Sequence, residues 1–393
     1  MSTRKLYVYY FRRLRQTANS SNSLYIKIIE AKITMQLLET IPNQLLNSLR
    51  DISQKVWLNY AELSITHADY EPLETPIEVK ERFQNVSAKL KEKYFAAQVR
   101  NFLYGIYYNG SLKNVLKLGT NSIEQQPQKI IENNTFLGIN LKFYEQLHRN
   151  NCGNGYFEPG WTVCRQESED DLAVVKDNLT LHIEKKRHLK QSELASVGDF
   201  VSIRMPKNRV QNGFYMAIGD AGSNIYPETV RIYFNLTAEG AVAVMKSLTY
   251  KLNRINVPFN FKVLYDPSVY YRHDSGVLYF ERSQYLDVKK ILTEVYAETQ
   301  SYFKTAIPLF TKLLAPGLAL AEEPNLKFTE KESFGTNRCQ IVGNGLLAAY
   351  YSENNSPQEK MDSIIQQFSL LGIDWQRPYL NSNSKDIYTL LDI

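Results

Sequence analysis

Apolar residues recur every three or four positions through the first third of the chain. This spacing runs through LLETIPNQLLNSLRDISQKVWL and again through VKERFQNVSAKLKEKYFAAQVRNFLYGIYY, and it is typical of amphipathic helices. Thr75 followed by Pro76 marks a helix start, because proline is favoured at the first helical position. We therefore predict a helical domain over residues 35–150, which is either a plain helical bundle or a docking surface for a partner peptide.

Short segments with alternating apolar residues follow this region. Among them are GDFVSIRMP, NGFYMAIGD, TVRIYFNL, FNFKVLYD and GVLYFER, and the alternation predicts β-strands. One helix interrupts them, because Thr237 is a good N-cap and Ala241, Val244 and Leu248 follow at helical spacing. Helical segments close the chain. The sequence thus predicts an α+β fold, with a second domain over residues 151–393 whose central sheet is largely antiparallel.

Charge is unevenly distributed along the chain. Residues 1–34 contain seven basic residues and one acidic residue, a charge of +6, whereas the whole chain carries +5. The remainder is therefore close to neutral, which argues against a nucleic-acid surface on the folded body. We interpret residues 1–34 as a basic N-terminal extension without the long apolar core of a secretory signal.

Composition and motifs exclude several classes of protein. With 44% apolar residues the chain is globular, and its three cysteines form no CxxC or Cys/His cluster. No run of about 18 apolar residues is present, so we expect no membrane span and a cytoplasmic location. GxGxxG, Walker A, HExxH and GxSxG motifs are also missing, which disfavours nucleotide- and metal-dependent catalysis. We expect no metal and no organic cofactor.

Cationic and aromatic side chains share one face of the strand VRIYFNL. Alternation places Ile232 and Phe234 on its apolar face, so Arg231, Tyr233 and Asn235 lie on the other. That second face is either a solvent-facing ladder or part of a binding site.

A lysine interrupts a second apolar strand. Lys262 lies between Phe261 and Val263 in FKVLYD, so it lies at a sheet edge, where a lysine discourages aggregation, or in a cleft. Arg272 and Asp274 precede another strand and could simply form an exposed turn. Basic groups that recur on neighbouring strands nevertheless suit a phosphate dianion, for which arginine supplies bidentate donors and lysine a point charge.

The blocks GNGYFEPGW, VGDFVSIRMPKNRVQNGFYMAIGDAG, VRIYFNLTAEGAVAVMKSLTYKLN, VPFNFKVLYDPSVYYRHDSGVLYFER and FGTNRCQIV resemble, in that order, the HopA/HrmA type III effector family. The likeness covers at least residues 150–345. Members of that family also act as the lyase of class V lanthipeptide pathways. The resemblance therefore implies a phosphorylated precursor peptide with a leader, and a separate Ser/Thr kinase that phosphorylates it.

A weaker resemblance, to the OspF/SpvC phosphothreonine lyases, covers the order VRIYFNL, helix, FKVLYD, then R...GVLYF. It implies that Lys262 is the general base, that Arg231 replaces the lysine of a Lys-x-His motif, and that Arg272 binds phosphate. Tyr233 occupies the position at which those enzymes have the histidine that acts as the general acid. The acid is then Tyr233, or His182 from LTLHIEKK, or the fold binds without catalysis.

Further residues complete the predicted site. Arg338 lies in a block that resembles the effector family and is a third phosphate ligand, whereas Arg204 and Arg209 either contact phosphate or belong to a solvated loop. Tyr215 is part of either the pocket or a turn. Asn235, Asp274 and Tyr279 are the remaining predicted pocket residues.

The sequence thus predicts a cofactor-independent carbon–oxygen lyase in a lyase-like α+β domain. It would eliminate phosphate from phosphoserine or phosphothreonine to leave dehydroalanine or dehydrobutyrine. The alternative is a non-catalytic, effector-like module that binds a phosphorylated or acidic partner.

Overall fold

The structure of the protein is a computed structural model. It describes residues 43–118, 140–190, 195–223, 227–352 and 355–392. The chain divides into two compact units, residues 1–50 and 51–393. The predicted basic extension, residues 1–34, lies outside the described residues, and the predicted domain limits stay predictions. None of the described helices combines the length and apolar character that a membrane-crossing helix needs.

The first described region contains helices and a small sheet. Its elements are α3 (Asn43–Lys55), β1 (Val56–Asn59), β2 (Ser64–His67), β3 (Tyr70–Glu74), α4 (Ile77–Gln84), α5 (Ala88–Leu103), the π-helical turn η1 (Tyr104–Tyr108) and α6 (Leu141–Asn150). Strands β1, β2 and β3 pair antiparallel in that order. The helical prediction was wrong for residues 56–74, because Val56 and Trp57 begin an alternation of buried and exposed side chains that suits a strand.

A seven-stranded sheet forms the centre of the predicted second domain. Its order is β13 (Lys312–Ala315), β14 (Leu318–Glu322), β10 (Thr229–Phe234), β12 (Gly276–Glu281), β11 (Asn260–Leu264), β9 (Phe214–Ile218) and β8 (Asn208–Gln211). Every neighbouring pair in this sheet is antiparallel. The predicted α+β fold with a largely antiparallel central sheet is therefore confirmed.

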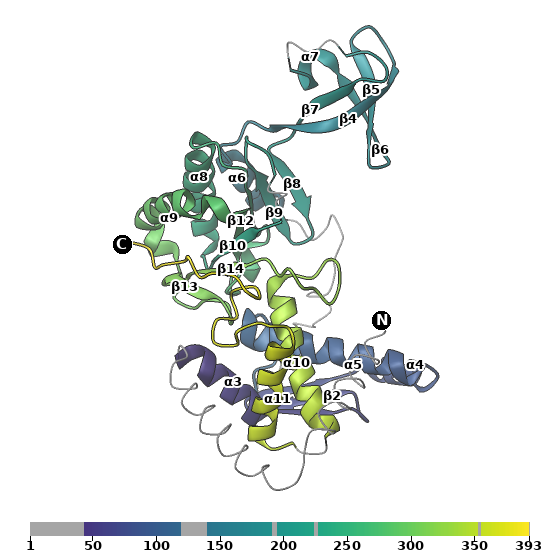
Figure 1. The fold of residues 1–393 in the computed structure, drawn as a ribbon, viewed down its shortest axis with the longest axis vertical. Coiled ribbons are helices and arrows are strands. Elements are labelled where there is room, and N and C mark those ends of the chain that lie inside the picture. Colours follow the sequence, from purple (N-terminus) through teal and green to yellow (C-terminus); the bar gives the residue numbers. More distant parts are fainter. Residues whose placement is uncertain (1–42, 119–139, 191–194, 224–226, 353–354, 393) are drawn as a thin grey trace. The chain divides into compact units, whose positions relative to one another are not determined.

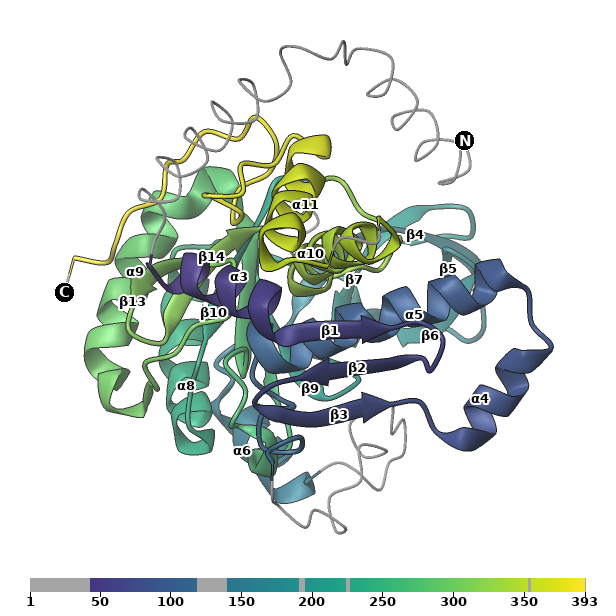
Figure 2. The ribbon, with the colours of Figure 1, turned by 90° about the horizontal axis from the view of Figure 1, so that it is seen from below.

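Helices α8 (Ala238–Arg254) and α9 (Tyr285–Thr299) lie side by side next to this sheet (Figures 1 and 2). The hydroxyl of Thr237 accepts a hydrogen bond from the backbone N–H of Gly240, as predicted for the N-cap of α8. The apolar residues predicted for α8, Ala241, Val244 and Leu248, are all buried. Short 3₁₀ turns also occur at η4 (Pro267–Val269), η5 (Arg282–Gln284) and η6 (Gln300–Tyr302).

A separate four-stranded sheet has the order β6 (Leu179–Glu184), β5 (Asp171–Lys176), β4 (Tyr156–Gln166) and β7 (Phe200–Met205), with the short helix α7 (Lys185–His188) after β6. The turn between β5 and β6 uses Asp177 and Asn178, both at positive φ (49° and 64°), which is the backbone that a tight two-residue hairpin requires. Trp161, Leu172 and Val174 belong to a hydrophobic core of its own.

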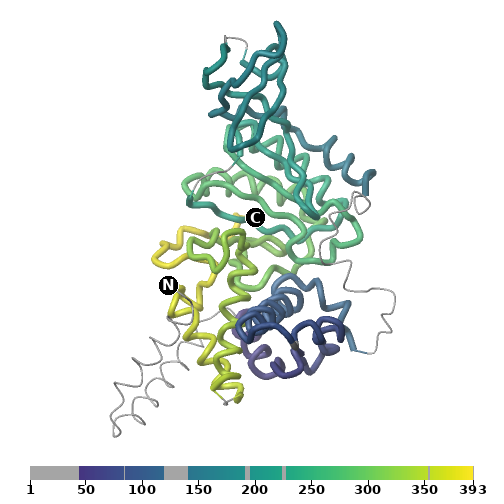
Figure 3. Tube along the Cα trace, turned by 90° about the vertical axis from the view of Figure 1, so that its right-hand side faces the viewer, coloured from purple at the N-terminus to yellow at the C-terminus, as the bar shows by residue number. Residues whose placement is uncertain are grey.

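Two helices near the C-terminal end pack against the first region. They are α10 (Phe334–Tyr351) and α11 (Pro357–Leu370). Figure 3 shows them beside α5, which is far away in the sequence, and α10 contacts both α5 and α11. Lys360 of α11 is 2% exposed and donates a hydrogen bond of 2.8 Å to the carbonyl oxygen of Val56, so it links α11 to β1.

Two glycines in α10 provide a matched test of this packing. A Cβ atom added to Gly345 would lie 2.6 Å from the Cα atom of Ile364, whereas one added to Gly343 would lie 3.4 Å from Cγ1 of Val99, an ordinary contact. We expect Gly345→Ala to lower the free energy of unfolding by about 1–3 kcal/mol through overpacking. Gly343→Ala should raise it by up to about 1 kcal/mol, because alanine is the better helix former. Urea unfolding measures both, and equal stabilities would contradict the helix contact described above.

Candidate functional site

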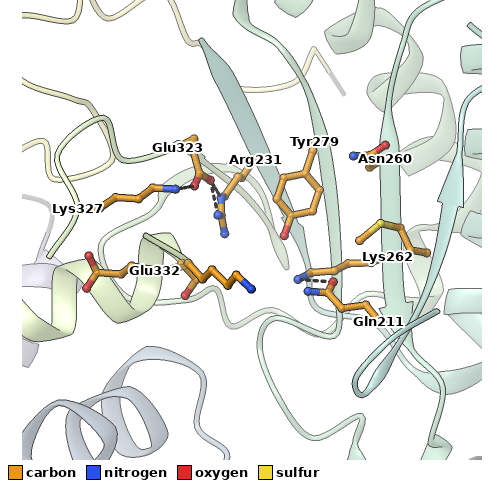
Figure 4. Close-up of a pocket in the computed structure, with 11 residues that line it drawn as sticks. Gln211, Arg231, Asn260, Lys262, Tyr279, Glu323, Lys327 and Glu332 are labelled. Carbon is orange, nitrogen blue, oxygen red and sulfur yellow. Dashed lines mark hydrogen bonds and ion pairs between the residues drawn. The ribbon is translucent and has the colours of Figure 1, made fainter. Parts of the chain in front are cut away.

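A pocket of about 310 Å³ opens on one face of the seven-stranded sheet. Its lining side chains come from β8, β9, β10, β11 and β12 and from the segment between β14 and α10 (Figure 4). It is lined by Gln211, Met216, Arg231, Asn260, Lys262, Tyr279, Glu323, Lys327, Lys331, Glu332 and Ser333. Four of these side chains are basic and two are acidic, so the pocket favours anionic ligands.

Strand register brings Arg231, Tyr279 and Lys262 together. Arg231 of β10 lies directly opposite Tyr279 of β12, and Tyr279 lies opposite Asn260 of β11. Lys262 is two residues beyond Asn260, so both side chains project from the same face of β11. Cζ of Arg231 is 5.0 Å, and Nζ of Lys262 is 5.5 Å, from the centroid of the Tyr279 ring. Figure 4 shows the ring between the two cations.

Lys262 lies in a cleft and not at a sheet edge. Strand β11 is an interior strand between β12 and β9. The ammonium group is 4.5 Å from the centroid of the Phe214 ring, and it donates a hydrogen bond of 3.4 Å to Oε1 of Gln211. Among the described residues, Lys262 forms no ion pair with a carboxylate. It is therefore the basic group on the sheet side of the pocket that has no carboxylate partner among the described residues.

Arg231 is almost completely buried, with 8% of its surface exposed. Its guanidinium donates through Nε to Oε2 of Glu323, and its Nη2 pairs with the same oxygen. Burial by itself would lower the pKa of Arg231, but the neighbouring Tyr279, Tyr233 and Glu323 outweigh burial and raise the pKa above its usual value. The guanidinium therefore stays charged and is oriented by its carboxylate partner.

The segment between β14 and α10 contributes residues that the sequence analysis did not identify. Lys327, Lys331 and Glu332 line the pocket, and Ser333 is the N-cap of α10, with its side chain accepting from the N–H of Thr336. No acidic residue lies in the first turn of α10, and Glu332 is the acidic residue that directly precedes its N-cap. The sequence signal for these residues was the occurrence of Lys327 and Lys331 shortly before Ser333, a residue type that is typical of a helix N-cap.

Tyr233 does not line the pocket, although it shares a strand face with Arg231. It is 2% exposed, and its hydroxyl has no hydrogen-bond partner among the described residues. Its ring lies against Tyr108 and Phe334, with centroids 6.3 Å from each. Burial raises the pKa of its hydroxyl above the usual value. Asn235, next on the same face, is 1% exposed and donates to the carbonyl oxygen of Ala306, so it has a structural role.

Arg272 and Asp274 pair with each other outside the pocket. Nε and Nη2 of Arg272 each donate to one carboxylate oxygen of Asp274 at 2.9 Å, and Tyr104 adds a third bond of 3.1 Å. Burial would raise the pKa of Asp274, but Arg272 and these hydrogen bonds lower it below 3.8. Asp274 is buried and Arg272 is partly buried, so the pair is a structural unit. The predicted phosphate-binding role of Arg272 is not supported by its position.

Arg338 is a structural residue of α10. It is 0% exposed, and it donates to the carbonyl oxygens of Pro378 (2.7 Å) and Leu380 (3.1 Å) and to Oδ1 of Asn337. Burial lowers its pKa to about 10, so it stays charged at neutral pH. It anchors residues 378–380 to α10 and does not reach the pocket.

The other predicted residues also lie outside the pocket. His182 is in β6 and pairs with Glu167 at 2.6 Å. Arg204 is in β7 and donates to the carbonyl oxygen of Asn154 at 2.9 Å. Arg209 is in β8 and bonds the hydroxyl of Tyr156. Tyr215 is 0% exposed and faces away from Met216, accepting a hydrogen bond from Asn151.

One group of potential metal ligands exists elsewhere in the described residues. Asp51, His67 and Asp69 place ligand atoms within 4.8 Å of one another. Nζ of Lys55 lies 2.7 Å from Asp51 and 2.6 Å from Asp69. An ammonium group therefore already contacts both carboxylates, and we do not assign a metal to this cluster.

Comparison with known proteins supports the predicted family. Residues 205–380 match the HopA1 effector protein family, and this range contains every residue that lines the pocket. The resemblance predicted from the sequence is therefore confirmed over this segment. The likeness predicted for residues 150–204 lies outside the match and stays a prediction.

Two solved structures are similar to the chain. They are the effector proteins of Pseudomonas syringae pathovar tomato strain DC3000 and of pathovar syringae strain 61. Each is 13% identical, with a TM-score of 0.38, and the match covers 62% of this chain and 81% of theirs. No match was found among curated proteins.

The buried Arg272–Asp274 pair gives a stability prediction. We expect Asp274→Asn to lower the free energy of unfolding at pH 7 by about 2–4 kcal/mol, because the partly buried Arg272 would lose its counter-charge. Asp287→Asn removes a carboxylate from an exposed pair with Lys290 and should cost less than about 1 kcal/mol. Urea unfolding of both variants checks the contrast, and similar losses would show that the burial of Asp274 is unimportant.

The same pair predicts a pH dependence. Because the pKa of Asp274 is lowered below 3.8 in the folded protein, its stabilising contribution is present above pH 3.8 and is lost as the pH falls further. The stability difference between the wild type and Asp274→Asn should therefore be full at neutral pH and shrink below pH 3.8. Unfolding curves at several pH values measure it, and a constant difference would contradict the assignment.

Proposed function

We propose that the pocket binds a phosphorylated serine or threonine of a peptide and eliminates its phosphate. The observation that carries this proposal is the convergence of Arg231, Tyr279 and Lys262 from three adjacent strands in a pocket with four basic side chains. Elimination needs a cationic site for the phosphate, a base for the α-proton and an acid for the leaving oxygen. The pocket offers a candidate for each.

Several groups are suited to the phosphate. Lys327 and Lys331 lie on the segment that leads into α10, and the N-terminus of α10 follows at Ser333. Arg231 completes the set from the sheet. Lysines act as point charges and arginine as a bidentate donor, so the phosphate would lie between the sheet and the start of α10.

Lys262 is the proposed base. In its neutral form Nζ accepts the α-proton of the phosphorylated residue, and the electron pair of the Cα–H bond forms the Cα=Cβ double bond. The Cβ–O bond breaks at the same time, and its electrons leave with the phosphate oxygen. The products are a dehydroalanine or dehydrobutyrine residue and inorganic phosphate. Cations around the phosphate stabilise the charge that develops on the leaving oxygen.

Tyr279 is the proposed acid. Neither residue that the sequence suggested for this role lines the pocket, because Tyr233 is buried beside Tyr108 and Phe334 and His182 belongs to the separate four-stranded sheet. Tyr279 lines the pocket and lies within reach of both Arg231 and Lys262. Its hydroxyl would protonate the leaving oxygen.

The resemblance to the lanthipeptide lyases extends the proposal to the partners. A precursor peptide with a leader would be the substrate, and a separate Ser/Thr kinase would phosphorylate it. The helical region before residue 150 would recognise the leader or dock the kinase. No metal or organic cofactor enters this reaction, because proton transfer and phosphate binding use side chains alone.

A second candidate function is a non-catalytic module that binds a phosphorylated or acidic partner. The positions of Tyr233, His182 and Arg272 favour it, because three residues proposed for catalysis or phosphate binding lie outside the pocket. This module would bind the partner through the same cations but would not eliminate phosphate from it.

Mass spectrometry of phosphoserine and phosphothreonine peptides distinguishes the two functions. We expect the wild type to convert these peptides to products that have lost phosphoric acid, and Lys262→Ala to slow the reaction at least about 100-fold, because a positioned base contributes about that much or more. Lys290→Ala, which removes an exposed lysine from α9, is the matched control and should react like the wild type. Peptides that bind but stay intact would favour the binding module.

Substitution of Tyr279 tests the acid separately. Tyr279→Phe keeps the ring against Arg231 and Lys262 and removes only the hydroxyl. We expect kcat to fall by about 100-fold or more while phosphopeptide binding changes little. Tyr302→Phe, an exposed tyrosine outside the pocket, is the control. An unchanged kcat in Tyr279→Phe would show that Tyr279 is not the acid, and it would not contradict the role of Lys262 as the base.

A further inference from the structure

Glu323 lies between two cations of the pocket. Nε and Nη2 of Arg231 both reach its Oε2, and Nζ of Lys327 donates to its Oε1 at 2.6 Å. The side chain of Glu323 is 19% exposed, and that of Arg231 is 9% exposed. Figure 4 shows the carboxylate between the two cationic groups, at the wall of the pocket. Each of its oxygens therefore has its own cation.

This arrangement is the one that an oxyanion ligand needs. Arginine binds carboxylate and phosphate through the same planar donors, and a lysine on a second oxygen adds a charge-assisted hydrogen bond. The protein thus already holds an anionic group where its own cations would hold a phosphate. Lys331 and Lys262 lie in the same pocket, and no carboxylate partner occupies either of them among the described residues.

Only the side chain of Glu323 has to move to vacate this position. Its backbone N–H donates a hydrogen bond of 2.8 Å to the carbonyl oxygen of Thr229, so its main chain continues the edge of the β14–β10 pairing. The carboxylate, in contrast, is held by side-chain contacts alone. Rotation of that side chain would free Arg231 and Lys327 without unfolding any strand.

We propose that Glu323 is an internal competitor that occupies the phosphate position of the empty pocket and that an incoming phosphate displaces. The apparent dissociation constant of an anion is then the intrinsic constant divided by the fraction of molecules in which Glu323 has moved away. The anion's identity as phosphate rests on the proposed function, whereas the competition itself rests on the contacts of Glu323.

Competition with Glu323 favours ligands that carry more negative charge than a single carboxylate. A carboxylate from an acidic peptide offers Arg231 and Lys327 no more charge than Glu323, which is tethered next to them and has a high effective concentration. A phosphate dianion offers a second charge and further oxygens, which Lys331 can contact. Glu323 thereby favours phosphorylated peptides over merely acidic ones.

The test measures binding of inorganic phosphate by calorimetry, which requires no turnover. Glu323→Gln removes the competing charge, and we expect it to bind phosphate at least about fivefold more tightly than the wild type, the lower end of typical coupling between two ligands of one site. Glu330→Gln is the matched control, because it removes the same charge from an exposed position on the same segment. It should stay within about twofold of the wild type, since exposed charges are screened by salt.

Glu323→Asp gives a second measurement in case Glu323→Gln does not fold. It keeps the charge but shortens the side chain, so its gain in phosphate affinity should lie between those of the wild type and Glu323→Gln. Equal or weaker phosphate binding by the Glu323 variants, or no binding by any of the proteins, would overturn the proposal. Tighter binding by Glu323→Gln without any elimination from phosphopeptides would support the competitor and reject only the lyase.

Discussion

Strands β10, β12 and β11 pair antiparallel in a register that sets Arg231 opposite Tyr279 and places Lys262 on the same face. The opposite face of these strands holds the register, because Ile232 and Phe261 are completely buried there. A slip of one residue in any of these strands would exchange its two faces and bury a polar or charged side chain in the apolar core. The arrangement of the polar side chains in the pocket therefore depends on the hydrophobic packing of the opposite face of the same strands.

Among the described residues, Arg231 and Arg338 are buried and Arg272 is partly buried. The partners of these three arginines decide what each can do. Arg338 is surrounded by backbone carbonyl oxygens, which fix it as an anchor for the C-terminal segment. Arg272 is satisfied by both oxygens of Asp274. Arg231 also has a carboxylate partner, Glu323, but this pair lines an open pocket that a ligand can enter. A buried arginine costs too much free energy to remain unpaired, so the difference between a structural and a functional arginine lies in whether its partner can be replaced.

The pocket combines elements that are distant in the chain. Strands supply Arg231, Tyr279 and Lys262, whereas Lys327 and Lys331 come from the segment that ends at the N-cap of α10. Each of these strands is paired on both sides, whereas the segment before α10 lies outside the strands of the sheet. In the proposed function, a phosphorylated residue would lie between the side chains of the sheet and the lysines of this segment.

Local pattern determined much of this protein. Alternation in VRIYFNL and FKVLYD correctly predicted the strands and put Arg231 and Lys262 on polar faces, and Thr237 correctly marked the start of α8. These inferences succeeded because strand alternation and helix capping depend on residues close in the sequence. Only the tertiary structure decided that Tyr233 is buried away from the pocket and that Glu323 enters it. Strand pairing and the path of the segment before α10 bring together residues far apart in the chain, and no local periodicity encodes that proximity.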